Sequence, residues 1–165
     1  MATIARKSTQ FIAGMLRAET GLPQSVAFLA AASEVAVPEL TNLPILVSNV
    51  SAELAEKTSG LKYPAFQIFC ERITNSLREK FRTFSGTAEM VIEVRVSHDR
   101  LESVDEQMQL YIDAVTDVLD RNRGDWGNGM FYTGGYEIVP GPIKHGGRNF
   151  LQIAKVRFQL IISMD

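Results

Sequence analysis

Two histidines and one cysteine are the side chains in this 165-residue sequence best suited to catalysis or metal binding. His98 stands in His98-Asp99-Arg100, where a predicted strand gives way to a loop, and a polar turn explains it without a metal, which would need further ligands at fitting spacing. Cys70 falls on the apolar side of a predicted strand with no histidine to activate it, so a small buried side chain is the better interpretation. We expect no enzyme activity, no metal and no cofactor.

Two glycine-rich stretches have the composition of anion-binding loops. Residues 124–129 resemble a phosphate loop, but glycine fingerprints for phosphate lie between a strand and a helix start, and these glycines follow a predicted helix and precede a predicted strand. Lys144 and Arg148 flank a second stretch, where a backbone nest with two cations could hold an anion. A plain hairpin turn is the simpler alternative.

Acidic side chains are concentrated in one short segment. Residues 101–126 contain seven acidic and two basic side chains, whereas the whole chain has a net charge of only −2. The segment is predicted to be helical, and its acidic stripe lies opposite the apolar face: Glu106, Asp113, Asp117 and Asp120. The stripe is either an ordinary solvated helix face or the wall of a channel past which DNA slides, because like charge repels phosphates.

The helix that positions this stripe is predicted over residues 103–121. Ser103 and Glu106 have the spacing of a capping box. The apolar side chains then recur at about 100° per residue and form one face: Val104, Met108, Tyr111, Ile112, Val115, Val118 and Leu119. Further helices are predicted over 3–20 and 26–32.

Alternating apolar residues predict the strands. The longest stretch, residues 150–163, puts five apolar side chains on one parity: Ala154, Val156, Phe158, Leu160 and Ile162. Shorter strands are predicted at 45–47, 66–77, 88–96 and 136–139. The fold class is therefore α+β, with a mainly antiparallel sheet of four to five strands and helices packed on one face.

Length and composition favour a single domain over residues 1–165. Residues 1–60 form its helical N-terminal part, in which 22–60 can be a docking arm or part of the core, and 61–165 hold the sheet and long helix. Hydrophobic residues at 45% and charged residues at 22% are typical of globular chains, and the small net charge argues against a basic nucleic-acid-coating protein. No uninterrupted apolar run is long enough for a membrane span.

Five segments occur in this order: Tyr-Pro-Ala-Phe-Gln-Ile-Phe-Cys-Glu (63–71), Phe-Ser-Gly-Thr-Ala-Glu-Met-Val-Ile-Glu-Val-Arg-Val-Ser (84–97), Leu-Tyr-Ile-Asp-Ala-Val (110–115), Gly-Asp-Trp-Gly-Asn-Gly-Met-Phe-Tyr (124–132) and Lys-His-Gly-Gly-Arg-Asn-Phe-Leu-Gln-Ile-Ala (144–154). Together they resemble the tail terminator, or tail-completion, proteins of long-tailed bacteriophages. The resemblance lies in the order of these segments and in their residue types, over roughly the last two-thirds of the chain, and it includes no catalytic signature.

This resemblance implies a subunit that closes into a ring, a homo-hexamer, which caps the finished tail tube and stops its polymerisation. The ring would then join the tube to the neck while DNA passes through its lumen without sequence-specific binding. Partners are other copies, the tail tube protein, the sheath if the tail is contractile, and a neck or head-closure protein. The implied location is the tail–neck junction of the virion, after assembly in the bacterial host cytoplasm, with no membrane partner.

Aromatic and basic residues of the C-terminal half are the expected subunit or partner contacts, because aromatic side chains bury large areas and carry a polar handle. They are Trp126, Phe131, Tyr132, Tyr136, Lys144 and Arg148. The alternative for the aromatic loop, residues 126–136, is that it packs on its own sheet.

Two other functions stay open on the sequence alone. A different neck or head-completion adaptor ring would share most of these features. A small-molecule-binding or enzymatic α+β domain would instead need a pocket with convergent polar groups, for which the loops at 98–103 and 124–135 are the best candidates.

Overall fold

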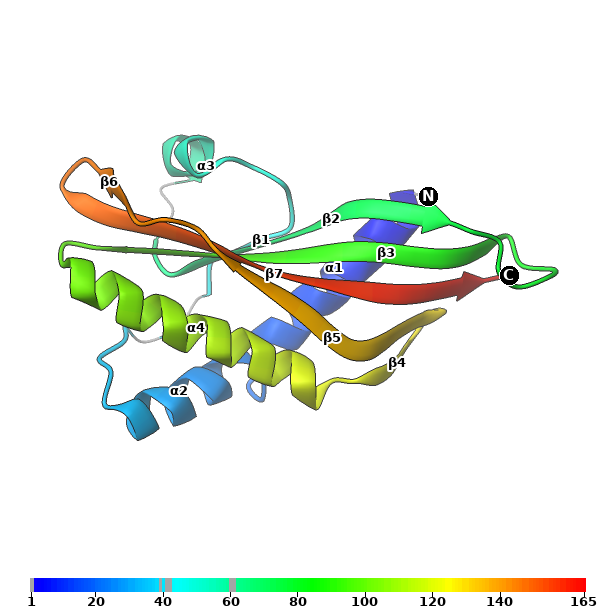
Figure 1. Cartoon of the computed structure of the whole chain (residues 1–165), viewed down its shortest axis with the longest axis horizontal. Coiled ribbons are helices and arrows are strands. Elements are labelled where there is room, and N and C mark those ends of the chain that lie inside the picture. The colour runs from blue at the N-terminus through cyan, green and yellow to red at the C-terminus, as the bar shows by residue number, and fades with distance from the viewer. Residues whose placement is uncertain (1, 39, 41–42, 60–61) are drawn as a thin grey trace.

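A long, twisted sheet organises the fold (Figure 1), and the computed structural model describes residues 2–38, 40, 43–59 and 62–165. The expected N-terminal arm is therefore described except at 39, 41–42 and 60. The helices and strands are, in chain order, α1 (Ala2–Arg17), α2 (Leu22–Ser33), β1 (Ile45–Leu46), α3 (Ala52–Ser59), β2 (Ala65–Asn75), β3 (Phe84–His98), α4 (Leu101–Arg121), β4 (Gly124–Gly127), β5 (Met130–Pro140), β6 (Lys144–Gly146) and β7 (Asn149–Met164).

The chain is α+β, but its sheet is larger than expected and mixed. Among the described residues it has seven strands in the order β1-β2-β3-β7-β5-β4, with β6 also pairing with β7. The prediction of four to five mainly antiparallel strands was wrong on two grounds. Strand β1 runs parallel to β2, and the glycine-rich stretches expected to be loops pair as β4, β5 and β6.

Strand β7 is the central strand, as its length requires. It pairs with β3 along the whole ladder from Phe84↔Met164 to His98↔Phe150, and with β5 on its other side. A strand of 16 residues exposes a long row of backbone donors and acceptors, and only partners on both sides can satisfy them. The predicted parity is confirmed: the five alternating apolar side chains of 154–162 are all buried.

Helices α1, α2 and α4 lie on one side of the sheet (Figure 1). The fully buried Tyr111 of α4 meets Phe66 of β2 edge-on, with ring centroids 6.1 Å apart. Phe66 therefore faces the helices, and so do the even-numbered residues in register with it on β3 and β7, as well as those of β2 before its bulge. The predicted helix 103–121 is real but begins at Leu101. Its N-cap is Arg100, with no side-chain cap hydrogen bond, so the predicted capping box does not start the helix.

The opposite face is partly covered by the segment that leads into α3. Arg95 points to this face and is 1% exposed; its guanidinium contacts Glu93 at 2.7 Å and donates to the Gln67 side chain at 3.2 Å. The same group donates to the backbone carbonyl of Val50, at 2.5 Å. Placing all helices on one face was therefore an incomplete prediction, because α3 lies on the other face (Figure 1) and the segment leading to it is bonded there to Arg95 through Val50.

Candidate assembly surfaces

The side chains with catalytic potential are occupied in local structure. The Nδ1 atom of His98 lies 2.8 Å from Oδ1 of Asp99 and accepts a hydrogen bond from the backbone N–H of Arg100 at 3.0 Å. These contacts form the polar turn between β3 and α4. His145 packs edge-on against Phe150 in the β6–β7 hairpin, with centroids 5.6 Å apart. Within the described part of the chain, no three His, Cys, Asp or Glu side chains are grouped so that they could hold a metal ion.

Cys70 is half-buried near the middle of β2. Its thiol donates to the backbone carbonyl of Arg72 at 3.5 Å, across a bulge in the strand. Burial raises the pKa of the Cys70 thiol above its ordinary value. The side chain therefore stays protonated at neutral pH, as expected of a structural rather than a nucleophilic cysteine.

The glycine-rich stretch 124–129 is the start of a β-hairpin, not an anion loop. Asn128 and Gly129 turn the chain with positive φ angles of 53° and 76°. A Cβ atom at Gly129 would lie 2.0 Å from the carbonyl oxygen of Ser163, so only glycine lets the hairpin approach β7 this closely. The glycine is needed for strand packing.

The hairpin aromatics divide into buried and exposed pairs. Trp126 and Tyr132 lie in the chain's own core, where Trp126 stacks on Phe11 at 4.8 Å and donates its indole N–H to the carbonyl of Asn122 at 2.6 Å. Phe131 and Tyr136 stay 45% and 40% exposed. Only the exposed pair is thus available, on this structure, for the contact role expected of all four aromatics.

Lys144 and Arg148 flank the β6–β7 hairpin and are both exposed. Gly147 supplies the positive φ of 70° that this turn requires. The Lys144–Arg148 stretch is thus the plain hairpin turn that was the simpler alternative, with its cations free to meet an external group.

The predicted acidic stripe lies on one exposed side of α4, but its halves differ. At the C-terminal half, Asp117 accepts hydrogen bonds from the Ser25 hydroxyl at 2.6 Å and from Arg121 at 3.2 Å, and Asp120 pairs with Arg123 at 2.9 Å. The Ser25 bond joins α4 to α2, and the two arginines neutralise the charge locally.

At the other half, Glu106 and Asp113 border a shallow cleft of about 310 Å³ against α2. Of the four residues of the predicted stripe, only Glu106 and Asp113 therefore have no ion pair with a described side chain.

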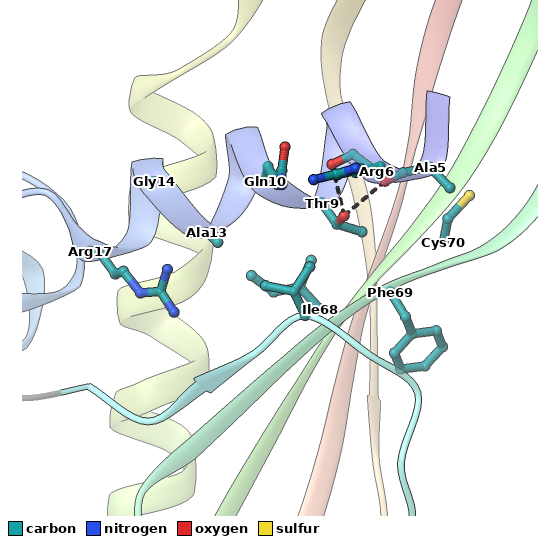
Figure 2. Close-up of a pocket in the computed structure, with 11 residues that line it drawn as sticks. Ala5, Arg6, Thr9, Gln10, Ala13, Gly14, Arg17, Ile68, Phe69 and Cys70 are labelled. Atoms are coloured by element: carbon teal, nitrogen blue, oxygen red, sulfur yellow. Dashed lines mark hydrogen bonds between the residues drawn. The ribbon is translucent and has the colours of Figure 1, made fainter. Parts of the chain in front are cut away.

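A larger groove runs between α1 and the outer edge of β2 (Figure 2). Its volume is about 810 Å³, and one wall is α1, whose groove-lining residues include several small ones: Ala5, Thr9, Ala13 and Gly14. The Thr9 hydroxyl donates to the Ala5 carbonyl at 2.8 Å, so its hydrogen is already used within α1. Recurrence of small residues four positions apart on α1, at Ala5, Thr9 and Ala13, was the sequence signal for this groove, and our sequence analysis missed it.

The edge of β2 that borders the groove has no strand beside it. Strand β1 pairs only with Phe66 and Gln67 and ends at Leu46. Because the N–H of Phe66 points outward to Pro44 and the pleat alternates, Ile68 and Cys70 also direct backbone groups outward. Among the described residues, no strand therefore pairs with β2 on this edge beyond Gln67, and Val47, which directly follows β1, lines the groove beside it.

The sheet is open at its other side as well. Strand β4 covers β5 only at residues 130–132, so residues 136–140 of β5 have no strand on their outer side in the described part of the chain. Tyr136 and Ile138, both 40% exposed, stand on this second open edge. An open edge with exposed apolar side chains is a template for pairing with another strand.

No helix of the described residues is long and apolar enough to cross a membrane. In comparisons with known proteins, no protein-family model matches this chain and no curated protein matches its sequence.

Proposed function

We propose that this chain is a ring-forming structural protein of a long-tailed bacteriophage, a tail terminator that caps the tail tube. The ring, a homo-hexamer, halts polymerisation of the tube and joins it to the neck, and DNA passes through its lumen. The sequence resemblance supplies the family, and the architecture of the subunit supports it.

One observation carries the proposal: in the part of the chain that the structure describes, a single sheet is open at both edges, on β2 and on β5. A subunit whose two different edges both lack partners joins other copies head to tail, and such heterologous contacts close into a ring when the rotation between copies allows it. Enzymes organise convergent polar groups in a cleft, whereas the groove between α1 and β2 is lined mainly by small and apolar side chains.

Charge on the subunit fits the passage of DNA. Glu106 and Asp113 remain exposed on α4 without a salt bridge among the described side chains, so a surface bearing them repels phosphates and offers no cationic anchor. This is the property that a conduit for DNA needs.

The test has two stages. Size-exclusion chromatography with light scattering and negative-stain imaging should show a closed ring rather than a monomer. Purified rings mixed with polymerised tail tube should then bind the tube ends and stop growth. Binding to portal alone would assign the chain to a head-completion adaptor, and a clean monomer stabilised by a metabolite would assign it to a small-molecule-binding domain.

A further inference from the structure

The two open edges of the sheet lie at the same level along its strands. Laddered pairs join Cys70 to Met90, Met90 to Phe158 and Phe158 to Tyr136, so one row of the sheet runs from the open part of β2 to the open part of β5. A second row runs through Ile68, Ile92, Val156 and Ile138. Each copy thus presents an exposed strand where the next copy has a vacant edge.

Strand directions also agree. Strand β2 is antiparallel to β3, β3 to β7, and β7 to β5, so β5 runs opposite to β2. A neighbouring copy rotated about an axis roughly along the strands keeps its strand directions. Its β5 therefore meets β2 as an antiparallel partner, the arrangement in which backbone hydrogen bonds form directly across the pair.

Side chains on the two edges are complementary in shape. Tyr136 and Ile138 face the helix side, because their partners Phe158 and Val156 are buried there. When β5 of one copy lies beside β2 of another, these exposed side chains enter the groove between β2 and α1. The α1 wall combines four small residues, Ala5, Thr9, Ala13 and Gly14, with the longer polar side chains of Arg6, Gln10 and Arg17, and the small residues leave room for a tyrosine and an isoleucine.

We propose that the groove between α1 and β2 is the docking site for strand β5 of a second copy of this chain, with residues 136–138 added antiparallel to residues 68–70 and with Tyr136 and Ile138 filling the groove. The inference rests on the proposed ring and names the contact that closes it. Strand addition of this kind takes affinity from main-chain hydrogen bonds and specificity from pockets for alternate side chains.

The single native cysteine makes the contact directly testable in the full-length protein. Cys70 stands in the row of Tyr136, so Tyr136→Cys places two thiols on facing strands of adjacent copies. Oxidation with copper–phenanthroline should produce a ladder of disulfide-linked species that ends at the subunit number of the ring. The reaction is run at about pH 8.5 or above, because burial raises the pKa of the Cys70 thiol.

Two matched controls use the same gel. Adding Cys70→Ser to Tyr136→Cys should abolish the ladder, because one thiol of each pair is lost. Phe131→Cys should also give no ladder, since Phe131 is similarly exposed but points to the opposite face of the sheet, in register with Ile161.

A second variant tests the groove without relying on cysteine chemistry. Gly14 lies at the border of the groove, and an added Cβ there meets no atom within 4 Å, so Gly14→Leu is expected to leave the subunit fold intact and to narrow the groove. We expect association to weaken by about tenfold or more while the circular dichroism spectrum is unchanged. Gly14→Ala, which adds little volume, should assemble normally.

The outcomes separate this inference from the proposed function. Rings that form in the wild type, yet show neither the ladder nor sensitivity to Gly14→Leu, overturn the edge pairing, leave the terminator proposal standing and assign the groove to another occupant. A product that stops at a dimer overturns head-to-tail addition. A wild-type protein that stays monomeric at all concentrations overturns both.

Discussion

Phe11 and Trp126 stack with their ring centroids 4.8 Å apart and their planes inclined by 23°. Phe11 belongs to α1 and Trp126 to β4, so the contact ties the first helix to the short strand at one side of the sheet. Trp126 also contacts Tyr132 of β5, so a cluster of aromatic side chains joins α1 to β5.

Trp126→Ala should lower the free energy of unfolding by about 3–5 kcal/mol, because a large buried aromatic leaves a cavity. The measurement is urea unfolding followed by circular dichroism at a fixed protein concentration, since the variant lacks the only tryptophan. Phe131→Ala on the next strand removes an exposed ring and should change the free energy by less than about 1 kcal/mol. Equal losses in the two variants would contradict the buried placement of Trp126.

Arg95→Met should destabilise the chain by about 3–5 kcal/mol, because it leaves the buried Glu93 carboxylate without its partner. The double variant Arg95→Met, Glu93→Leu removes both charges and should regain most of that loss in the same urea experiment. If the double variant is as unstable as the single one, the arginine acts mainly by holding the carbonyl of Val50.

Stability should fall in alkali through buried Tyr111. Burial raises the pKa of Tyr111 to about 12, from an ordinary value near 10. The unfolded chain therefore releases this proton from about pH 10 and the folded chain only near 12. The free energy of unfolding is unaffected below about pH 10 and decreases between about pH 10 and 12, by at most about 1.4 kcal/mol per pH unit.

Tyr111→Phe should make this alkaline decrease shallower and cost little at neutral pH, because the Tyr111 hydroxyl has no hydrogen-bond partner in the described residues. Burial also raises the pKa of Tyr132 to about 12, so part of the slope should remain. Denaturant titrations at pH 8 to 12 measure the effect. The exposed Tyr136→Phe is the control, and it should leave the slope unchanged.

Glu106→Lys with Asp113→Lys should make assembled rings retain DNA at low salt if this side of α4 lines the lumen, because two cations replace two charges that repel phosphates. The measurement is a gel-shift or anisotropy titration at about 50 and 200 mM salt, where bound DNA should be released at the higher concentration. Glu34→Lys with Glu53→Lys, on exposed sites outside α4, is the charge-matched control. If the Glu106→Lys, Asp113→Lys variant and the control variant bind DNA equally, this side of α4 lies outside the lumen.

The sequence by itself determined the elements with strong local periodicity. Strand β7, strand β3 and helix α4 were predicted because an alternating or a 3.6-residue pattern specifies which side of an element is buried, whatever lies against it. The same reasoning located the acidic side of α4 and the polar turn at His98. These properties depend on residues close together in the chain.

Only the tertiary structure decided what depends on distant residues. Glycines at 124–129 indicate a loop locally, yet Gly129 lets a hairpin lie against Ser163, and Asp117 looks solvated until Ser25 and Arg121 bond to it. The open edges of β2 and β5 follow from where β1 ends and how far β4 extends. Strand pairing joins residues far apart in the sequence, so no local pattern encodes which edges of the sheet remain unpaired.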